Sequence, residues 1–361
     1  MTDQEQEIWR RLAEVTDPEL HRPLTELGMV ESVQVNGQKV TVAVKLTTAG
    51  CPLKGRIEGD VTKAMAGVQG IADVAVVTSV MTPEERQKLT QELRPVRHSS
   101  VTKEGSRVRV LIVGSGKGGV GKSTVAVNLA VALAQLGRAV GVLDADIYGF
   151  SVPRMIGVDR RPVVLSDDMI LPVESLGVQV ISMGMLVDEG TPVMWRGPML
   201  TKLLEQFMGD VMWGDLDYLV VDSPPGTGDV AITLAQRLHQ GQVLLVTTPQ
   251  VAASKVAVRV GEMAKKVGQR VLGVVENMSY LRCPSCGEPT RLFSGEGGQD
   301  LASALGAPLL GKVPVEAAIS EGGDLGQPIV FTHPKSESAA VFGLLAKAVD
   351  EAPWQVETAV S

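Results

Sequence analysis

Two lysines and a serine stand in a glycine-rich run that could bind the phosphates of ATP. Gly116 is followed by four residues and then by Gly121, Lys122 and Ser123, which is the P-loop spacing. In such a loop the backbone N–H groups wrap the phosphates, because glycines permit turns that side chains would block. Lys122 would reach the β- and γ-phosphates, and Ser123 would bind Mg²⁺. We therefore predict a nucleotide-binding run made of Gly116, Lys117, Gly118, Gly119, Val120, Gly121, Lys122, Ser123 and Thr124.

Two aspartates follow apolar stretches and could act on the same nucleotide. Asp146 lies just after residues 139–143, and Asp222 directly follows residues 218–221. An aspartate at the end of a buried strand near a P-loop can hold Mg²⁺ or orient the attacking water. We assign Asp222 to the magnesium shell and Asp146 to the hydrolytic water. No firm role is assigned to two further carboxylates, Asp144 and Asp229.

Phosphoryl transfer requires mainly positioning and charge stabilisation from a protein. Lys117, Lys122, Mg²⁺ and the loop amides would supply both, so we predict a slow ATPase with Lys117, Lys122 and Asp146 as its catalytic residues. Asn277 follows another apolar stretch and could hydrogen-bond the adenine edge, because an amide offers both a donor and an acceptor. An ordinary turn asparagine is the alternative.

Cys283 and Cys286 form a Cys-Pro-X-Cys-Gly turn that favours a metal site. Gly287 permits a left-handed backbone in which N–H groups point back at sulfur. A thioredoxin-like dithiol would need a helix at the second cysteine, which Gly287 and Pro289 oppose. Structural zinc sites and common iron-sulfur clusters require four protein ligands. No further cysteine or histidine lies at a ligand-like spacing from Cys283 and Cys286 in the sequence. A two-fold dimer would supply the missing pair.

The stretches that position these residues alternate between apolar strands and helices. Strands that are apolar throughout indicate a parallel sheet covered on both faces, and ligands bind beyond the carboxyl ends of such strands. A helix should begin near Lys122 and continue to Leu136. We predict an α/β fold, a doubly wound and mainly parallel P-loop domain over residues 107–361, with strands at 108–113, 139–143, 178–183, 218–221, 243–246, 271–275 and 308–310.

Residues 1–93 are predicted to form a small α+β domain, joined to the second domain by a linker at 94–106. Residues 30–35 and 40–46 alternate with period two on either side of Asn-Gly, which is a strong hairpin signal. The remaining elements are a strand at 74–80 and helices at 4–15, 53–65 and 83–93.

The composition limits the class of protein. The chain has 361 residues, of which 44% are hydrophobic, and a net charge of -7, which argues against a nucleic-acid-binding face. No apolar run approaches the roughly 18 residues of a membrane span, and residues 1–5 do not resemble a signal peptide. Three cysteines are too few for a disulfide framework. We expect a cytoplasmic protein that contacts neither membrane nor nucleic acid.

Several strings resemble known families. The string from Lys117 to Thr124 resembles the deviant P-loop of ATPases related to septum-site, plasmid-partition and nitrogenase iron proteins. In those proteins the extra lysine crosses a dimer interface to the partner's nucleotide, so the likeness implies a nucleotide-sandwich dimer. Residues 17–20 and 46–53 resemble the small domain of SufT- and PaaD-type iron-sulfur assembly factors. Cys51 lies in the second string, either as a reactive thiol or as a small buried hydrophobe.

The P-loop string and four further strings resemble those of the Mrp/ApbC iron-sulfur cluster carrier ATPases, and the resemblance covers nearly the whole chain. The resemblance implies a homodimer that holds a labile 4Fe-4S cluster on Cys283 and Cys286 of both copies. ATP binding and hydrolysis would control transfer to apo iron-sulfur proteins, with assembly scaffold proteins as further partners. It also favours Asn277 as an adenine contact. Phe150 departs from the proline usual in the family. The strings are Asp-Ala-Asp-Ile-Tyr-Gly at 144–149, Trp-Arg-Gly-Pro-Met at 195–199, Asp-Ser-Pro-Pro-Gly-Thr-Gly-Asp at 222–229 and Asn-Met-Ser-Tyr at 277–280.

Other functions stay open at this point. A positioning ATPase that cycles on membrane or DNA would need a basic tail or face, whereas residues 350–357 are acidic and contain a proline. A zinc-bridged dimer without a carrier role would suit the same four thiolates. A reductase like the nitrogenase iron protein would need two well-separated cysteines in each chain.

Overall fold

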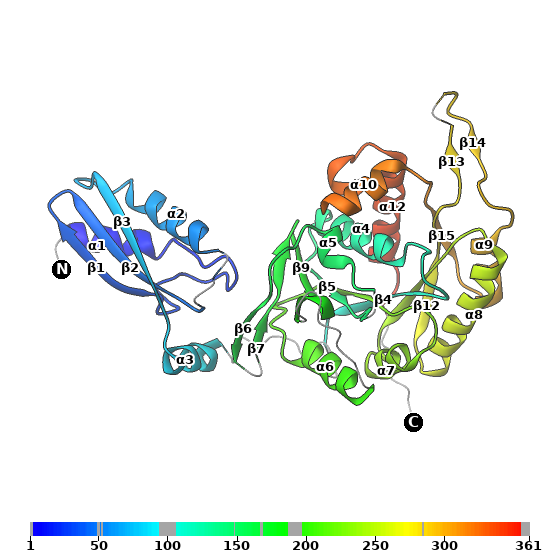
Figure 1. The fold of residues 1–361 in the computed structure, drawn as a ribbon, viewed down its shortest axis with the longest axis horizontal. Helices are drawn as coiled ribbons and strands as arrows, with labels where there is room; N and C mark the ends of the chain where they lie inside the picture. The colour runs from blue at the N-terminus through cyan, green and yellow to red at the C-terminus, as the bar shows by residue number, and fades with distance from the viewer. Residues whose placement is uncertain are drawn as a thin grey trace. The chain divides into compact units, whose positions relative to one another are not determined.

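The computed structural model divides into two compact units (Figure 1). The first comprises Met1–Arg97 with Val163–Leu171, and the second comprises His98–Pro162 with Pro172–Ser361. Of the predicted linker at 94–106, all but Ser106 lies outside the described residues. The structure describes residues 3–48, 51, 53–93, 106–147, 149–166, 169–186, 197–283 and 285–354.

The first unit is built on a three-stranded sheet in the order β1-β2-β3. β1 and β2 form the predicted antiparallel hairpin, and β3 runs parallel to β2. Alternate residues of β2 are buried, which is the period-two pattern of a strand with one face on a core. The bounds are α1 (Asp3–Leu12), β1 (Val30–Asn36), β2 (Lys39–Leu46), α2 (Lys54–Met65), β3 (Asp73–Val80) and α3 (Pro83–Leu93).

A short hairpin, β6 (Val163–Ser166) with β7 (Met169–Leu171), also belongs to this unit. The sequence prediction of one continuous second domain over residues 107–361 includes this hairpin in that domain. The reason for the difference is packing, because β6 contacts α3, and Leu165 is buried together with Leu89 and Leu93 of that helix.

The second unit holds an eight-stranded sheet in the order β15-β12-β11-β4-β10-β5-β9-β8. All neighbours are parallel except β8, which pairs antiparallel with β9. Every predicted strand of this domain is present, whereas the three-residue β8 is too short to show a pattern. The bounds are β4 (Arg109–Ser115), β5 (Val140–Asp144), β8 (Val173–Ser175), β9 (Val178–Ser182), β10 (Tyr218–Asp222), β11 (Gln242–Thr247), β12 (Arg270–Glu276) and β15 (Leu309–Lys312).

Helices cover both faces of this sheet, with α4, α10 and α12 on one face and α6 and α7 on the other (Figure 1). The bounds are α4 (Lys122–Gln135), α5 (Val152–Met155), the 3₁₀ helix Met183–Leu186, α6 (Gly197–Gly209), α7 (Asp229–Arg237), α8 (Val251–Lys266), α9 (Gly297–Leu305), α10 (Ala317–Leu325), α11 (Ile329–Thr332) and α12 (Glu337–Glu351).

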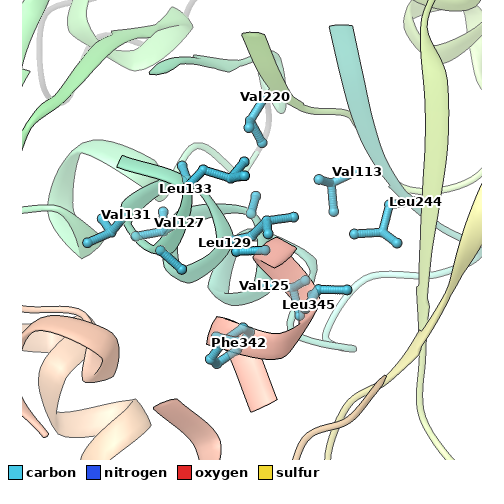
Figure 2. Packing of buried hydrophobic residues seen from close by; sticks show 14 of the residues in the cluster. Val113, Val125, Val127, Leu129, Val131, Leu133, Val220, Leu244, Phe342 and Leu345 are labelled. Carbon is cyan, nitrogen blue, oxygen red and sulfur yellow. The ribbon is translucent and has the colours of Figure 1, made fainter. Parts of the chain in front are cut away.

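Helix α4 is buried between the sheet and α12 and is apolar on nearly all sides. Figure 2 shows Val125 and Leu129 of α4 beside Phe342 and Leu345 of α12. All four side chains are fully buried in one cluster with residues of the central strands. This packing fixes the start of α4, and therefore the glycine-rich loop, against the sheet.

Truncation of Phe342 tests this packing. We expect Phe342→Ala to lower the free energy of unfolding by about 3–5 kcal/mol, because the ring is completely buried and its removal leaves a cavity. Urea denaturation followed by circular dichroism measures the effect. Leu344→Ala on the same helix is the control, since that side chain is 65% exposed and should change stability by no more than about 0.5 kcal/mol. Equal losses in both variants would contradict the packing argument.

Candidate nucleotide and metal sites

The glycine-rich loop connects Ser115, the last residue of β4, to Lys122, the first residue of α4. Gly121 precedes the helix with φ +81°, and a Cβ added there would collide with the side-chain amide of Asn277. A Cβ at Gly116 would collide with the backbone of α8. No side chain caps the start of α4, so its N–H groups are available to an anion.

The loop opens onto a pocket of ≈ 980 Å³. Asp146 lines this pocket as well. Two residues of the predicted nucleotide-binding run do not line it, because Gly116 lies against α8 and Val120 is buried. The predicted residues that do line it are Lys117, Gly118, Gly119, Gly121, Lys122, Ser123, Thr124 and Asn277.

The structure brings the predicted lysine, serine and aspartates together. Lys122 Nζ donates to Asp222 Oδ1 at 2.6 Å and lies 3.6 Å from Asp146 Oδ2. The Ser123 hydroxyl donates to Asp222 Oδ2 at 2.6 Å. Burial raises the pKa of the Asp222 carboxyl, and the charge of Lys122 opposes that rise. Carboxylate and hydroxyl oxygens are ligands that Mg²⁺ prefers, so the donor set of Ser123 and Asp222 suits this ion.

Asp144 organises the loop that carries Asp146, a role that sequence patterns did not reveal. Register pairing places Asp144 opposite Asp222 on neighbouring strands. Its carboxylate accepts from the Ser182 hydroxyl at 3.0 Å and from the Asp146 and Ser151 N–H groups, both at 3.2 Å. Burial, followed by the charge of Asp222, raises the pKa of Asp144 to about 7. Ser182 ends an apolar strand, which is the signal that could have identified it.

Lys117 and Asn277 make contacts of their own. Lys117 Nζ donates to Gln250 Oε1 at 3.1 Å, next to the start of α8. Asn277 Nδ2 donates to the Val120 carbonyl at 2.9 Å, so this buried amide fastens the glycine-rich loop. The predicted adenine contact of Asn277 stays a prediction. Asp229 is exposed at the first turn of α7, where a helix dipole favours a carboxylate.

Cys283 and Cys286 lie on a hairpin formed by β13 (Leu281–Arg282) and β14 (Pro289–Thr290), which projects beyond the end of the sheet (Figure 1). The turn is closed by the Cys283 N–H donating to Glu288 O at 3.0 Å and by the Gly287 N–H donating to Cys283 O at 2.8 Å. Gly287 has φ +73°, as the sequence predicts. The N–H groups of Cys286 and then Ser285 lower the pKa of the Cys283 thiol.

Within the described part of the chain, no group of three or more His, Cys, Asp or Glu side chains is arranged to hold a metal ion. Cys283 is half-buried and Cys286 is exposed. The two thiols of this hairpin are half of the four protein ligands that structural zinc sites and common iron-sulfur clusters take.

The lowered pKa of Cys283 has a measurable consequence. In a metal-free variant with Cys51 and Cys286 replaced by serine, backbone donors still face the remaining sulfur. As the pH is raised, we expect the rate of Cys283 alkylation by iodoacetamide to increase already below the ordinary thiol pKa of about 8.5. The reason is that a lowered pKa gives the reactive thiolate at lower pH. The same variant unfolded in urea is the reference, and coincident pH profiles would contradict the assignment.

The base of the hairpin is held by Glu337 at the start of α12. Its carboxylate accepts from Tyr280 Oη at 2.8 Å, from Arg282 Nη2 at 2.7 Å and from Arg282 Nε. Arg282 Nη1 also donates to the Gly287 carbonyl at 2.9 Å. Burial, followed by the bond to Glu337, raises the pKa of Tyr280 to about 12. No sequence pattern connects these residues, because Glu337 lies 55 positions beyond Arg282.

Other predicted features lie elsewhere or outside the description. Cys51 is half-buried just before α2 in the first unit. The string at 195–199 and the string at 144–149 fall partly on residues that the structure does not describe. Phe150, which departs from the resemblance, lies with its ring against the backbone of Gly184. None of the described helices is long and apolar enough to cross a membrane.

Two family profiles match the chain. Residues 107–350 match the family described as NUBPL iron-transfer P-loop NTPase. Residues 5–77 match the family described as iron-sulfur cluster assembly protein. The first match covers most of the α/β unit together with the β6–β7 hairpin, and the second lies within the small N-terminal unit.

Relatives and solved structures agree with these matches. An iron-sulfur cluster carrier protein of Mycobacterium leprae is 51% identical over 89% of this chain and 86% of its own length. One of Synechocystis is 44% identical over 94% of both chains. A nucleotide-binding protein of Archaeoglobus fulgidus in complex with ADP has 33% identity and a TM-score of 0.56, over 72% of this chain and 97% of its own. The cell division ATPase MinD of Pyrococcus furiosus has 27% identity and a TM-score of 0.52, over 67% of this chain and 98% of its own.

The deviant P-loop, the carboxylates beside it and the cysteine hairpin are therefore found in a chain that belongs to the iron-sulfur cluster carrier family of P-loop NTPases, with an N-terminal iron-sulfur cluster assembly domain.

Proposed function

We propose that two copies of this protein hold a 4Fe-4S cluster between their Cys283 and Cys286 pairs and transfer it to apo iron-sulfur proteins under the control of ATP. The observation that carries the proposal is the hairpin, which presents two cysteine thiols, half of a four-ligand set. A two-fold axis would complete the set. Assembly scaffold proteins are the proposed source of the cluster, and the cytoplasm is the proposed location because the thiols must stay reduced.

The nucleotide site would hydrolyse ATP slowly through its own side chains. The Lys122 ammonium contacts the carboxylate of Asp222 and lies near that of Asp146. In this position it can reach the β- and γ-phosphates of a bound nucleotide. Ser123 and Asp222 would hold Mg²⁺, which neutralises phosphate charge when it is bound. Asp146 lines the pocket and would orient the attacking water, while Asp144 keeps the loop of Asp146 in place.

Lys117 supports the dimer in this proposal. Its ammonium contacts Gln250 of the same chain at 3.1 Å, at the edge of the pocket. In the resembling ATPases the equivalent lysine reaches the nucleotide of the partner, and we propose the same role here. Dimerisation on ATP would then bring the two hairpins together.

Anaerobic reconstitution with iron and sulfide tests the proposal. The expected result is a brown dimer that loads an apo-enzyme in a timed assay, with a rate that changes when ATP is added. Metal analysis of protein purified without oxygen separates this from a zinc-bridged dimer, which the thiolate donors would also suit. A protein that stays monomeric with ATP and iron, or that binds zinc alone, would refute the carrier function.

A further inference from the structure

The hairpin that carries the cysteines has both of its ends in the nucleotide pocket. Asn277 and Met278, just before the hairpin, line the pocket, and so do Leu292 and Phe293, just after it. Among the described residues between these two pairs, the short hairpin of β13 and β14 is the only helix or strand element. The pocket and the cysteine pair are therefore connected through two short peptide segments.

The segment before the hairpin is firmly held. The Asn277 N–H donates to Thr247 O at 2.8 Å, and the Ser279 N–H donates to Val313 O at 2.9 Å. The Ser279 hydroxyl donates to the buried carboxylate of Glu276 at 2.6 Å. Met278 between them has φ +54°, a backbone conformation that a non-glycine residue adopts only where its surroundings impose it. This segment acts as a fixed support.

The segment after the hairpin is different, because most of it faces solvent. Arg291, Leu292, Ser294 and Glu296 are exposed, and Leu292 is 46% exposed although it is a large apolar residue. Leu292 and Phe293 nevertheless line the pocket of the phosphate loop. Apolar and aromatic side chains at the wall of such a pocket suit the flat face of a nucleotide base.

We propose that a bound nucleotide packs against Leu292 and Phe293 and so fixes the second end of the hairpin. Occupancy of the pocket then sets how rigidly the hairpin presents Cys283 and Cys286. This inference rests on the proposed function for the meaning of the two thiols, but its structural content concerns only the hairpin and the nucleotide. Leu292 and Phe293 are positioning residues in this scheme.

Hydrogen exchange at the Cys283 and Gly287 amides tests the coupling, since both amides close the hairpin turn. The full chain is measured with and without ADP, at a concentration that calorimetry shows to be saturating for each variant. We expect ADP to slow exchange about tenfold, which corresponds to about 1.4 kcal/mol of opening free energy. The double variant Leu292→Ala with Phe293→Ala should lose this slowing at an ADP concentration that calorimetry shows to be saturating for it.

The matched control is Phe331→Ala with Leu344→Ala, which removes the same residue types from exposed positions outside the pocket. It should keep the full slowing. Equal slowing in both double variants, or none in the parent chain when it is saturated with ADP, would overturn the inference. Iron binding is measured separately. If the chain binds iron but ADP does not slow amide exchange, only the coupling between nucleotide and hairpin is refuted. If ADP slows exchange but the chain binds no iron, only the carrier function is refuted.

Discussion

Replacing Cys283 and Cys286 together by alanine will reduce iron after anaerobic reconstitution to background and leave ADP binding unchanged. The reason is that, in the proposed function, the pair supplies one chain's half of the four sulfur ligands. Iron analysis and the visible spectrum measure the loss, and calorimetry with ADP shows that the pocket is intact.

Cys51→Ala is the control for this experiment. Cys51 lies in the first unit, and its loss removes one of the three cysteines without touching the hairpin. We expect this variant to keep its iron. If the double variant retains as much iron as the parent, the hairpin is not the cluster site and the carrier proposal falls.

Asp146→Asn will lower the rate of ATP hydrolysis by about 10²–10⁴-fold, the range expected when a group that activates water is lost. Asp146 lines the pocket 3.6 Å from Lys122 Nζ, and its carboxylate can orient water beside the γ-phosphate. An asparagine of the same size cannot accept a proton, so the affinity for ADP should stay the same while the rate of ATP hydrolysis falls. A phosphate-release assay under saturating ATP gives the rate, and calorimetry gives the affinity for ADP.

Asp229→Asn provides the comparison, because Asp229 is an exposed aspartate at the start of α7 that does not line the pocket. Its hydrolysis rate should equal that of the parent. A normal rate in Asp146→Asn would remove Asp146 from the mechanism, and Asp144 or Asp222 would have to carry the role.

Much of the sheet could be predicted because its strands are short, continuous apolar runs. The strands that end at Asp144 and Asp222 are buried along their whole length, and a parallel sheet brings their carboxyl ends to one edge. The same reasoning failed for β6 and β7, since a run of three or four residues has no period to detect and the grouping of this hairpin depends on its packing against α3.

Neighbouring residues along the chain were enough to identify the phosphate loop, the turn at Gly287 and the paired thiols, because backbone turns and ligand spacing are local properties. The contacts of Lys117 with Gln250 and of Arg282 with Glu337 could not be read in this way. They join residues 133 and 55 positions apart, and such contacts exist only after helices have packed on the sheet. The same packing makes Leu292 and Phe293 part of the nucleotide pocket, so the proposed link between nucleotide and cysteines became visible only in the folded chain.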